Sequence, residues 1–182
     1  MLTARASKRD KANFFSNDLR WDILDGETPI GGVVYDRGPL NAALIVNGES
    51  FTAARVSDRP DERLYQALVR VLAGGVKPPP NPFALQDAAG GTLALAESAG
   101  KSFAVSRGEE SFTFRKGASR PFNLYREGDD KPLGWVGQEK FWTTKMHMSL
   151  PAEFDAPFQI FLLVLLLNLT MQRLERMGDL SG

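Results

Sequence analysis

Gly100-Lys101-Ser102 forms the end of the phosphate-binding pattern G-x-x-x-x-G-K-[ST]. The first glycine of that pattern would have to stand at position 95, which is Leu95. A phosphate loop must also open a helix whose N-terminus faces the phosphates, whereas Phe103–Arg107 alternates like a strand. We therefore expect a hairpin turn at this place and no bound nucleotide.

The second candidate for chemistry is His147, the single histidine in a chain of 182 residues that has no cysteine. A His-dependent hydrolase or a zinc or iron site would have to use it. It lies in a strand-like segment between Met146 and Met148, on the face of Lys145 and Ser149, so we expect a surface residue there. The carboxylate pairs Glu109-Glu110 and Asp129-Asp130 fall at hairpin tips and are expected to be solvated. We expect no metal, no cofactor and no catalytic residues.

The third candidate is basic. The 22 Lys and Arg balance the 22 Asp and Glu overall, so no net charge argues for nucleic acid. Residues 101–126 are nevertheless rich in Lys and Arg, and Trp135, Phe141 and Trp142 follow. Basic residues beside aromatic ones suit an anionic membrane surface or a phosphorylated ligand. The alternative is that these charges only solvate outward strand positions. The candidate binding residues are Arg115, Lys116, Arg120, Arg126, Lys140 and Lys145.

The element that dominates the architecture is the C-terminal segment Phe158–Leu169, FQIFLLVLLLNL, which is apolar almost all round a helix. Asp155 suits an N-cap, Pro157 a first-turn proline and Gly178 a C-terminal cap, so we expect a helix from Ala156 to Met177. Twelve apolar residues cover about 18 Å against a hydrocarbon core of about 30 Å. This length is short for a membrane span and fits a helix buried in a protein core.

Most of the remaining chain alternates apolar and polar residues in short runs separated by turns, which predicts about 11 strands. The expected strands are Arg20–Leu24, Ile30–Tyr35, Ala42–Val46, Phe51–Val56, Phe83–Gln86, Thr92–Ala96, Phe103–Arg107, Ser111–Lys116, Phe122–Arg126, Pro132–Val136 and Phe141–Leu150. Arg107, Arg115, Lys145, His147 and Ser149 are expected to face solvent.

One amphipathic helix, Asp61–Ala73, is expected on the outside of the sheet, followed by the stiff proline-rich connector 77–82. A barrel of about 11–12 strands is too wide to be filled by its own side chains, so the apolar helix is expected inside it. The predicted fold is mainly β: a closed antiparallel barrel around a buried C-terminal helix. We expect a flexible basic leader at 1–18, a single domain at 19–177 and a tail at 178–182.

This arrangement resembles the tubby C-terminal-like superfamily, which includes LURP-one-related proteins and phospholipid scramblases. The resemblance rests on Trp21–Asp36, Pro121–Gly137 and the closing segment Pro151–Leu169, and covers roughly Leu19 to Leu174. It implies association with membranes or phosphoinositides, or a structural role, without settled catalytic residues. The chain departs from the scramblases because it lacks an acidic calcium segment, a cysteine cluster and a proline-rich leader.

The expected function is that of a non-catalytic, cytoplasmic barrel, peripheral at the membrane, which binds anionic lipid headgroups, phosphoinositides or a protein partner but no nucleic acid. Two alternatives remain at this point. The chain could carry an apolar small molecule in a START-like pocket, or it could be a tail-anchored membrane protein with Phe158–Leu169 inserted.

Overall fold

Twelve strands and one long helix make up the described part of the computed structural model, which covers residues 1–6, 18–36, 41–56, 82–99, 101–118, 121–138 and 145–178. The strands are β1 (Leu2–Ala6), β2 (Asp18–Asp25), β3 (Thr28–Asp36), β4 (Asn41–Val46), β5 (Glu49–Arg55), β6 (Phe83–Asp87), β7 (Thr92–Ala99), β8 (Ser102–Arg107), β9 (Glu110–Lys116), β10 (Phe122–Arg126), β11 (Gly134–Gln138) and β12 (Lys145–Ser149). The helix is α2 (Ala156–Gly178).

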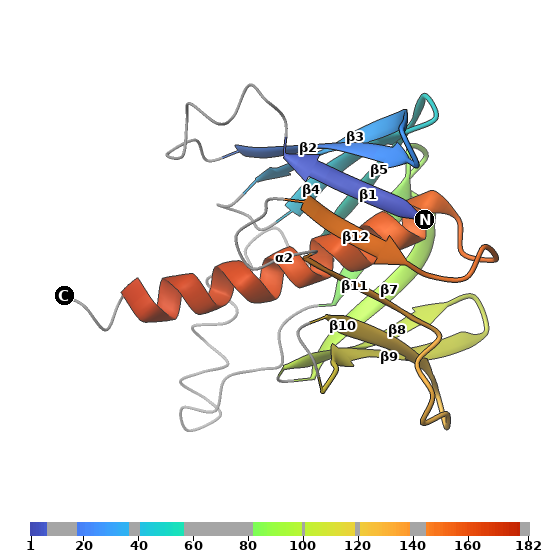
Figure 1. Cartoon of the computed structure of the whole chain (residues 1–182), viewed down its shortest axis with the longest axis vertical. Coiled ribbons are helices and arrows are strands. Elements are labelled where there is room, and N and C mark those ends of the chain that lie inside the picture. The colour runs from blue at the N-terminus through green and yellow to red at the C-terminus, as the bar shows by residue number, and fades with distance from the viewer. Residues whose placement is uncertain are drawn as a thin grey trace.

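The strands form a closed antiparallel barrel in which every strand pairs with its neighbours in the sequence and β1 closes the circle against β12. Figure 1 shows the barrel with α2 running through it. The expected mainly β barrel around a C-terminal helix is confirmed. Closure pairs both edges of each of the twelve described strands, which removes the surface on which open sheets aggregate.

The expected leader at 1–18 is wrong for its first residues, because Leu2–Ala6 form β1. Leu2 pairs with Asp25 of β2 on one side and with Met148 of β12 on the other. Leu2 and Ala4 are buried and Ala6 packs against the core, but two of these three inward residues are alanines, which are depleted in strands, so the short segment marks a strand only weakly. The barrel would remain open without this strand.

Tight turns fix the register of the hairpins. In the β4–β5 turn, Asn47 and Gly48 have φ values of 51° and 86°, so both central residues are left-handed, as in a type I′ turn. The Asn-Gly pair that predicted this hairpin is therefore required by its geometry. Gly31 is needed for another reason: a Cβ there would collide with the carbonyl oxygen of Ile45 on β4.

Helix α2 starts where the sequence predicts. The N–H of Phe158 donates a hydrogen bond of 2.9 Å to Oδ1 of Asp155, which makes Asp155 the N-cap. Every residue from Phe158 to Leu169 is buried, and Thr170 is exposed. The 23 residues of α2 extend about 34 Å, whereas a five-residue strand extends about 17 Å. The helix therefore starts inside the barrel and ends beyond it (Figure 1).

The core consists of the inward side chains of the strands packed around the helix. Phe112 of β9 contacts Phe154 and Phe158 with ring centroids 5.5 and 6.1 Å apart, close to the start of α2. Because the helix supplies a continuous run of buried apolar side chains along the axis, it fills the space that twelve strands leave open. The expected amphipathic helix Asp61–Ala73 and most of the connector lie outside the described residues.

Candidate anion-binding surface

The connections between strands alternate between the two ends of the barrel, because each strand is antiparallel to the next. At one end lie the residues that join β2 to β3, β4 to β5, β6 to β7, β8 to β9, β10 to β11 and β12 to α2. At the other end α2 leaves the barrel (Figure 1). We call the first end the acidic rim, for the charges described below, and the second end the helix-exit rim.

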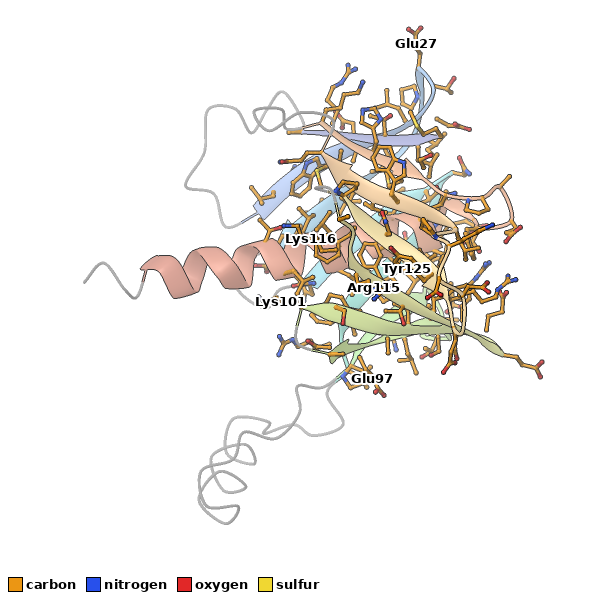
Figure 2. The ribbon with its side chains drawn as sticks, turned by 60° about the horizontal axis from the view of Figure 1, so that its bottom comes forward. Glu27, Glu97, Lys101, Arg115, Lys116 and Tyr125 are labelled. Atoms are coloured by element: carbon orange, nitrogen blue, oxygen red, sulfur yellow. The ribbon has the colours of Figure 1, made fainter. Side chains whose placement is uncertain are left out.

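The acidic rim carries eleven carboxylates on its turns and adjoining strand ends, against three Lys or Arg side chains. The acidic residues are Asp25, Glu27, Glu49, Asp87, Glu109, Glu110, Glu127, Asp129, Asp130, Glu153 and Asp155. The basic residues are Arg107, Arg126 and Lys131. Glu27, at the tip of the β2–β3 hairpin, marks this rim in Figure 2. This end of the barrel is therefore strongly negative.

The remainder of the described barrel has the opposite balance, with seven basic and four acidic residues. The basic residues are Arg5, Arg20, Arg55, Lys101, Arg115, Lys116 and Lys145. The acidic residues are Asp18, Asp22, Asp36 and Glu97. Most of these basic residues are among the first or last residues of their strands, at the ends that lie at the helix-exit rim. Although the chain is neutral overall, the acidic rim therefore has a net negative charge and the rest of the described barrel a net positive one.

Five segments between these strand ends lie outside the described residues, and only their composition can be given. Residues 7–17, 37–40, 57–81, 119–120 and 139–144 each connect two strands whose described ends lie at the helix-exit rim. Together they contain ten Lys and Arg residues against five Asp and Glu residues. The candidate residues Arg120 and Lys140, with Phe141 and Trp142, belong to these segments and lie outside the described residues.

Arg115 lies on the outer face of β9 and stacks on an aromatic ring. Its guanidinium carbon is 4.4 Å from the centroid of the Tyr125 ring on β10, and Nδ2 of Asn123 donates a 3.2 Å hydrogen bond to the Tyr125 hydroxyl. This contact holds the planar guanidinium against the outer face of the barrel, and its edges remain exposed. Figure 2 shows Arg115 and Tyr125 together on the side of the barrel. A held, exposed guanidinium is suited to binding phosphate or carboxylate oxygens in two-pronged fashion.

Lys101 and Lys116 are exposed at the helix-exit rim, on the side from which α2 leaves (Figure 2). Neither forms an ion pair with a described residue. Lys145, at the start of β12, is half-buried and pairs in register with Arg5 of β1. The sequence named Lys116 and Lys145 as candidate binding residues, counted Lys101 only within the basic segment 101–126, and did not include Arg5. Both residues adjoin connections at the helix-exit rim: Arg5 the connection from β1 to β2, and Lys101 the turn from β7 to β8. Assigning alternate connections to the same end of the barrel would have added Arg5 and Lys101 to the candidates.

Arg126 does not belong with the other candidates. It pairs in register with Phe112, whereas Lys116 pairs with Phe122, so the two lie at opposite ends of adjacent strands. Four residues of strand separate them by about 13 Å. At the acidic rim the Arg126 guanidinium is 2.9 Å from Glu110 and 4.0 Å from Glu153. Arg126 therefore neutralises local carboxylates rather than extending the basic surface.

Arg107 does not face outward as expected. It shares the inward parity of Phe103 and Val105 and ends β8 at the acidic rim. Its guanidinium lies 2.6 Å from the carboxylate of Asp155 and over the Phe158 ring at 5.2 Å. This side chain thus covers the start of α2.

His147 is buried, at 8% exposure, so the expectation of a surface histidine is wrong although its outward parity is correct. Its Nδ1 is 3.5 Å from Oγ1 of Thr3 on β1, and its ring lies 6.3 Å from that of Trp135. Trp135 itself is half-buried. Among the described residues, no group of three His, Cys, Asp or Glu side chains is placed to hold a metal ion.

The Lys101 turn lies between strands β7 and β8, and Oγ of Ser102 donates a 2.9 Å hydrogen bond to the carbonyl of Ala99. Strands flank the motif on both sides, as the sequence predicts, so the motif does not open a helix. Gly100 lies outside the described residues. In the described part of the chain, no helix is both long and apolar enough to span a bilayer.

Comparison with protein families, with curated proteins and with solved structures finds no match to this chain.

Proposed function

We propose that this chain is a non-catalytic barrel of the tubby C-terminal-like type that binds anionic lipid headgroups, phosphoinositides included, through its helix-exit rim. One observation carries the proposal: the charges of a neutral chain are separated along the barrel axis. A membrane that bears negative charge attracts the helix-exit rim and repels the acidic rim. The protein would therefore meet such a surface with the end at which α2 emerges.

The architecture supports the same proposal in a second way. Twelve antiparallel strands closed around an apolar C-terminal helix is the arrangement on which the resemblance to that superfamily rests. Arg115 on the Tyr125 ring supplies a rigid cation beside the rim, and Lys101 and Lys116 supply long, mobile ones. A rigid guanidinium selects the geometry of a phosphate, whereas lysines respond mainly to charge density.

The test is cosedimentation with vesicles that contain a fixed share of an anionic phospholipid, with neutral vesicles as the blank. The test variant is Lys101→Ser with Lys116→Ser, which removes two charges from the helix-exit rim. The matched control is Arg126→Ser with Lys131→Ser, which removes two charges from the acidic rim. Each basic residue near an anionic bilayer contributes about 1 kcal/mol, so we expect the test variant to bind about 30-fold more weakly.

We expect the control variant to bind anionic vesicles as the wild type does or slightly more weakly, because its charges point away from the bilayer. Wild-type binding should decline steeply as salt is added, since the attraction is screened beyond a Debye length of about 8 Å. Equal loss of binding in the two variants would show that the helix-exit rim has no special part. Absence of wild-type binding at low salt would refute the proposal.

A further inference from the structure

The inner lining of the helix-exit rim is rich in hydrogen-bond donors. Six strands run toward this rim, and in five of them the last inward residue is a donor that shares the parity of the buried residues before it. No described inward position at this rim is Asp or Glu. We call the five donors the mouth ring: Tyr35 of β3, Arg55 of β5, Ser98 of β7, Lys116 of β9 and Gln138 of β11.

An apolar side chain lies opposite each member of the mouth ring on a neighbouring strand. The pairs in register are Tyr35 with Leu19, Arg55 with Phe83, Ser98 with Phe103, Lys116 with Phe122 and Gln138 with Met146. Donors and apolar side chains therefore alternate around the end from which α2 leaves the barrel (Figure 1). An anion is held more strongly in such partly apolar surroundings than on an open surface, because the charges are less screened by water.

Arg55 is the member of the ring whose charge the described chain leaves unpaired. Its guanidinium carbon is 5.2 Å from the centroid of the Phe83 ring, which holds the half-buried side chain on the inner face of the barrel. Its Nε is buried without a hydrogen-bond partner, and Arg55 forms no ion pair with a described residue. Burial removes water from a charged group and is costly unless another group replaces that water. A bound anion would do so.

We propose that Arg55 binds a phosphate group on the inner side of the helix-exit rim, beside α2, which contacts β5. This inference rests on the proposed function, because it uses the end of the barrel that meets anionic headgroups. It adds a site inside the rim, whereas Arg115 lies on the outer face of β9. The ligand is a phosphate monoester, and its source is either a lipid headgroup or a soluble ester.

The chemistry of the ring favours phosphate over carboxylate. The guanidinium donates to two oxygens at once, and this uses both oxygens of a carboxylate but leaves a phosphate with more. Phe83 pairs with Arg55 on one side and with Ala96 on the other, and Ser98 is the next inward residue after Ala96. The Ser98 hydroxyl therefore lies across Phe83 from Arg55 and is suited to donate to a further phosphate oxygen.

Binding of inorganic phosphate to the full chain tests the site without a membrane. Isothermal titration calorimetry measures it, with chloride at equal ionic strength as the blank. We expect Arg55→Gln to bind phosphate about tenfold or more weakly than the wild type, because it loses charge-assisted hydrogen bonds. Lys131→Gln, exposed at the acidic rim, removes the same charge and should bind phosphate as the wild type does. Equal weakening in both variants would reduce the effect to net charge and overturn the site.

A second measurement on the wild type keeps the test decisive if Arg55→Gln folds poorly. The Nε–H of Arg55 is buried, so its proton is shielded from exchange with water and gives a signal in a ¹H–¹⁵N spectrum. The signal is identified by its absence from Arg55→Lys, which keeps the charge. Inorganic phosphate should shift it and chloride should not. A signal that phosphate leaves in place would overturn the site.

Vesicle cosedimentation then separates the two sources of the phosphate. Vesicles with phosphatidic acid, a phosphate monoester, are compared with phosphatidylserine vesicles, a diester, at matched surface charge. If a lipid supplies the phosphate, the wild type prefers the monoester vesicles, and Arg55→Gln loses this preference while it still binds the diester ones. If a soluble ester supplies it, Arg55→Gln binds inorganic phosphate weakly but both kinds of vesicle as the wild type does.

The two assays also distinguish failure of this site from failure of the proposed function. Phosphate binding that depends on Arg55, in a wild type that binds no anionic vesicle, would refute the proposed function and leave the site standing. Anionic vesicle binding by a wild type that binds inorganic phosphate no better than Arg55→Gln does would leave the proposed function standing and refute the site.

Discussion

The hydroxyl of Tyr35 on β3 donates a 2.9 Å hydrogen bond to Oδ1 of Asn168 on α2, across the interior of the barrel. Both side chains are fully buried, and 133 residues of sequence separate them. Nδ2 of Asn168 has no hydrogen-bond partner among the described residues. This buried polar contact links the barrel wall to the helix inside it within a largely apolar core, so it favours one rotation of the helix about its axis.

Tyr35→Phe should lower the free energy of unfolding by about 1–3 kcal/mol, because it leaves the buried Oδ1 of Asn168 without a donor. Asn168→Leu in the same background should recover part of the loss, since it removes an amide that then has no partner at all. Urea denaturation of the wild type, both single variants and the double variant measures the coupling energy. Strictly additive effects would show that the bond contributes nothing as a pair.

Leu165→Lys should prevent folding of the barrel. Leu165 is at 0% exposure in the middle of α2, so lysine would place an unpaired charge among apolar side chains. The expected cost is several kcal/mol, comparable to the stability of a whole domain. Circular dichroism and thermal unfolding check this, with Thr170→Lys, at the exposed end of the buried run, as the control. A cooperatively folded Leu165→Lys protein would place the helix at the periphery.

Asp155 has two separable roles that its variants can distinguish. Asp155→Asn keeps a side-chain oxygen for the N–H of Phe158 but removes the ion pair with Arg107, whereas Asp155→Ala removes both. The cap is worth about 1 kcal/mol, and a half-exposed ion pair is worth less. We expect Asp155→Ala to lower the unfolding free energy clearly more than Asp155→Asn. Equal losses would assign the effect to the ion pair.

The strand pattern could be predicted because eleven strands alternate over several residues and are punctuated by turns such as Asn47-Gly48. β1 could not, because its alternation is short and rests on Leu2 and two alanines, and its role depends on pairing with β12 at the far end of the chain. The error on His147 follows from the same omission. Its outward parity was predictable, but its burial depends on Thr3 of β1, which lies opposite it.

The candidate site was predicted only in part, because proximity in sequence was taken for proximity in space. Arg115, Lys116 and Arg126 lie within twelve positions, but a short strand and its turn carry Arg126 to the other rim. The strand order of a meander places alternate connections at the same end, and this alone separates the acidic turns from the basic connections. No feature of the sequence by itself reveals the ring of Tyr125 under Arg115, which depends on the register of β9 against β10.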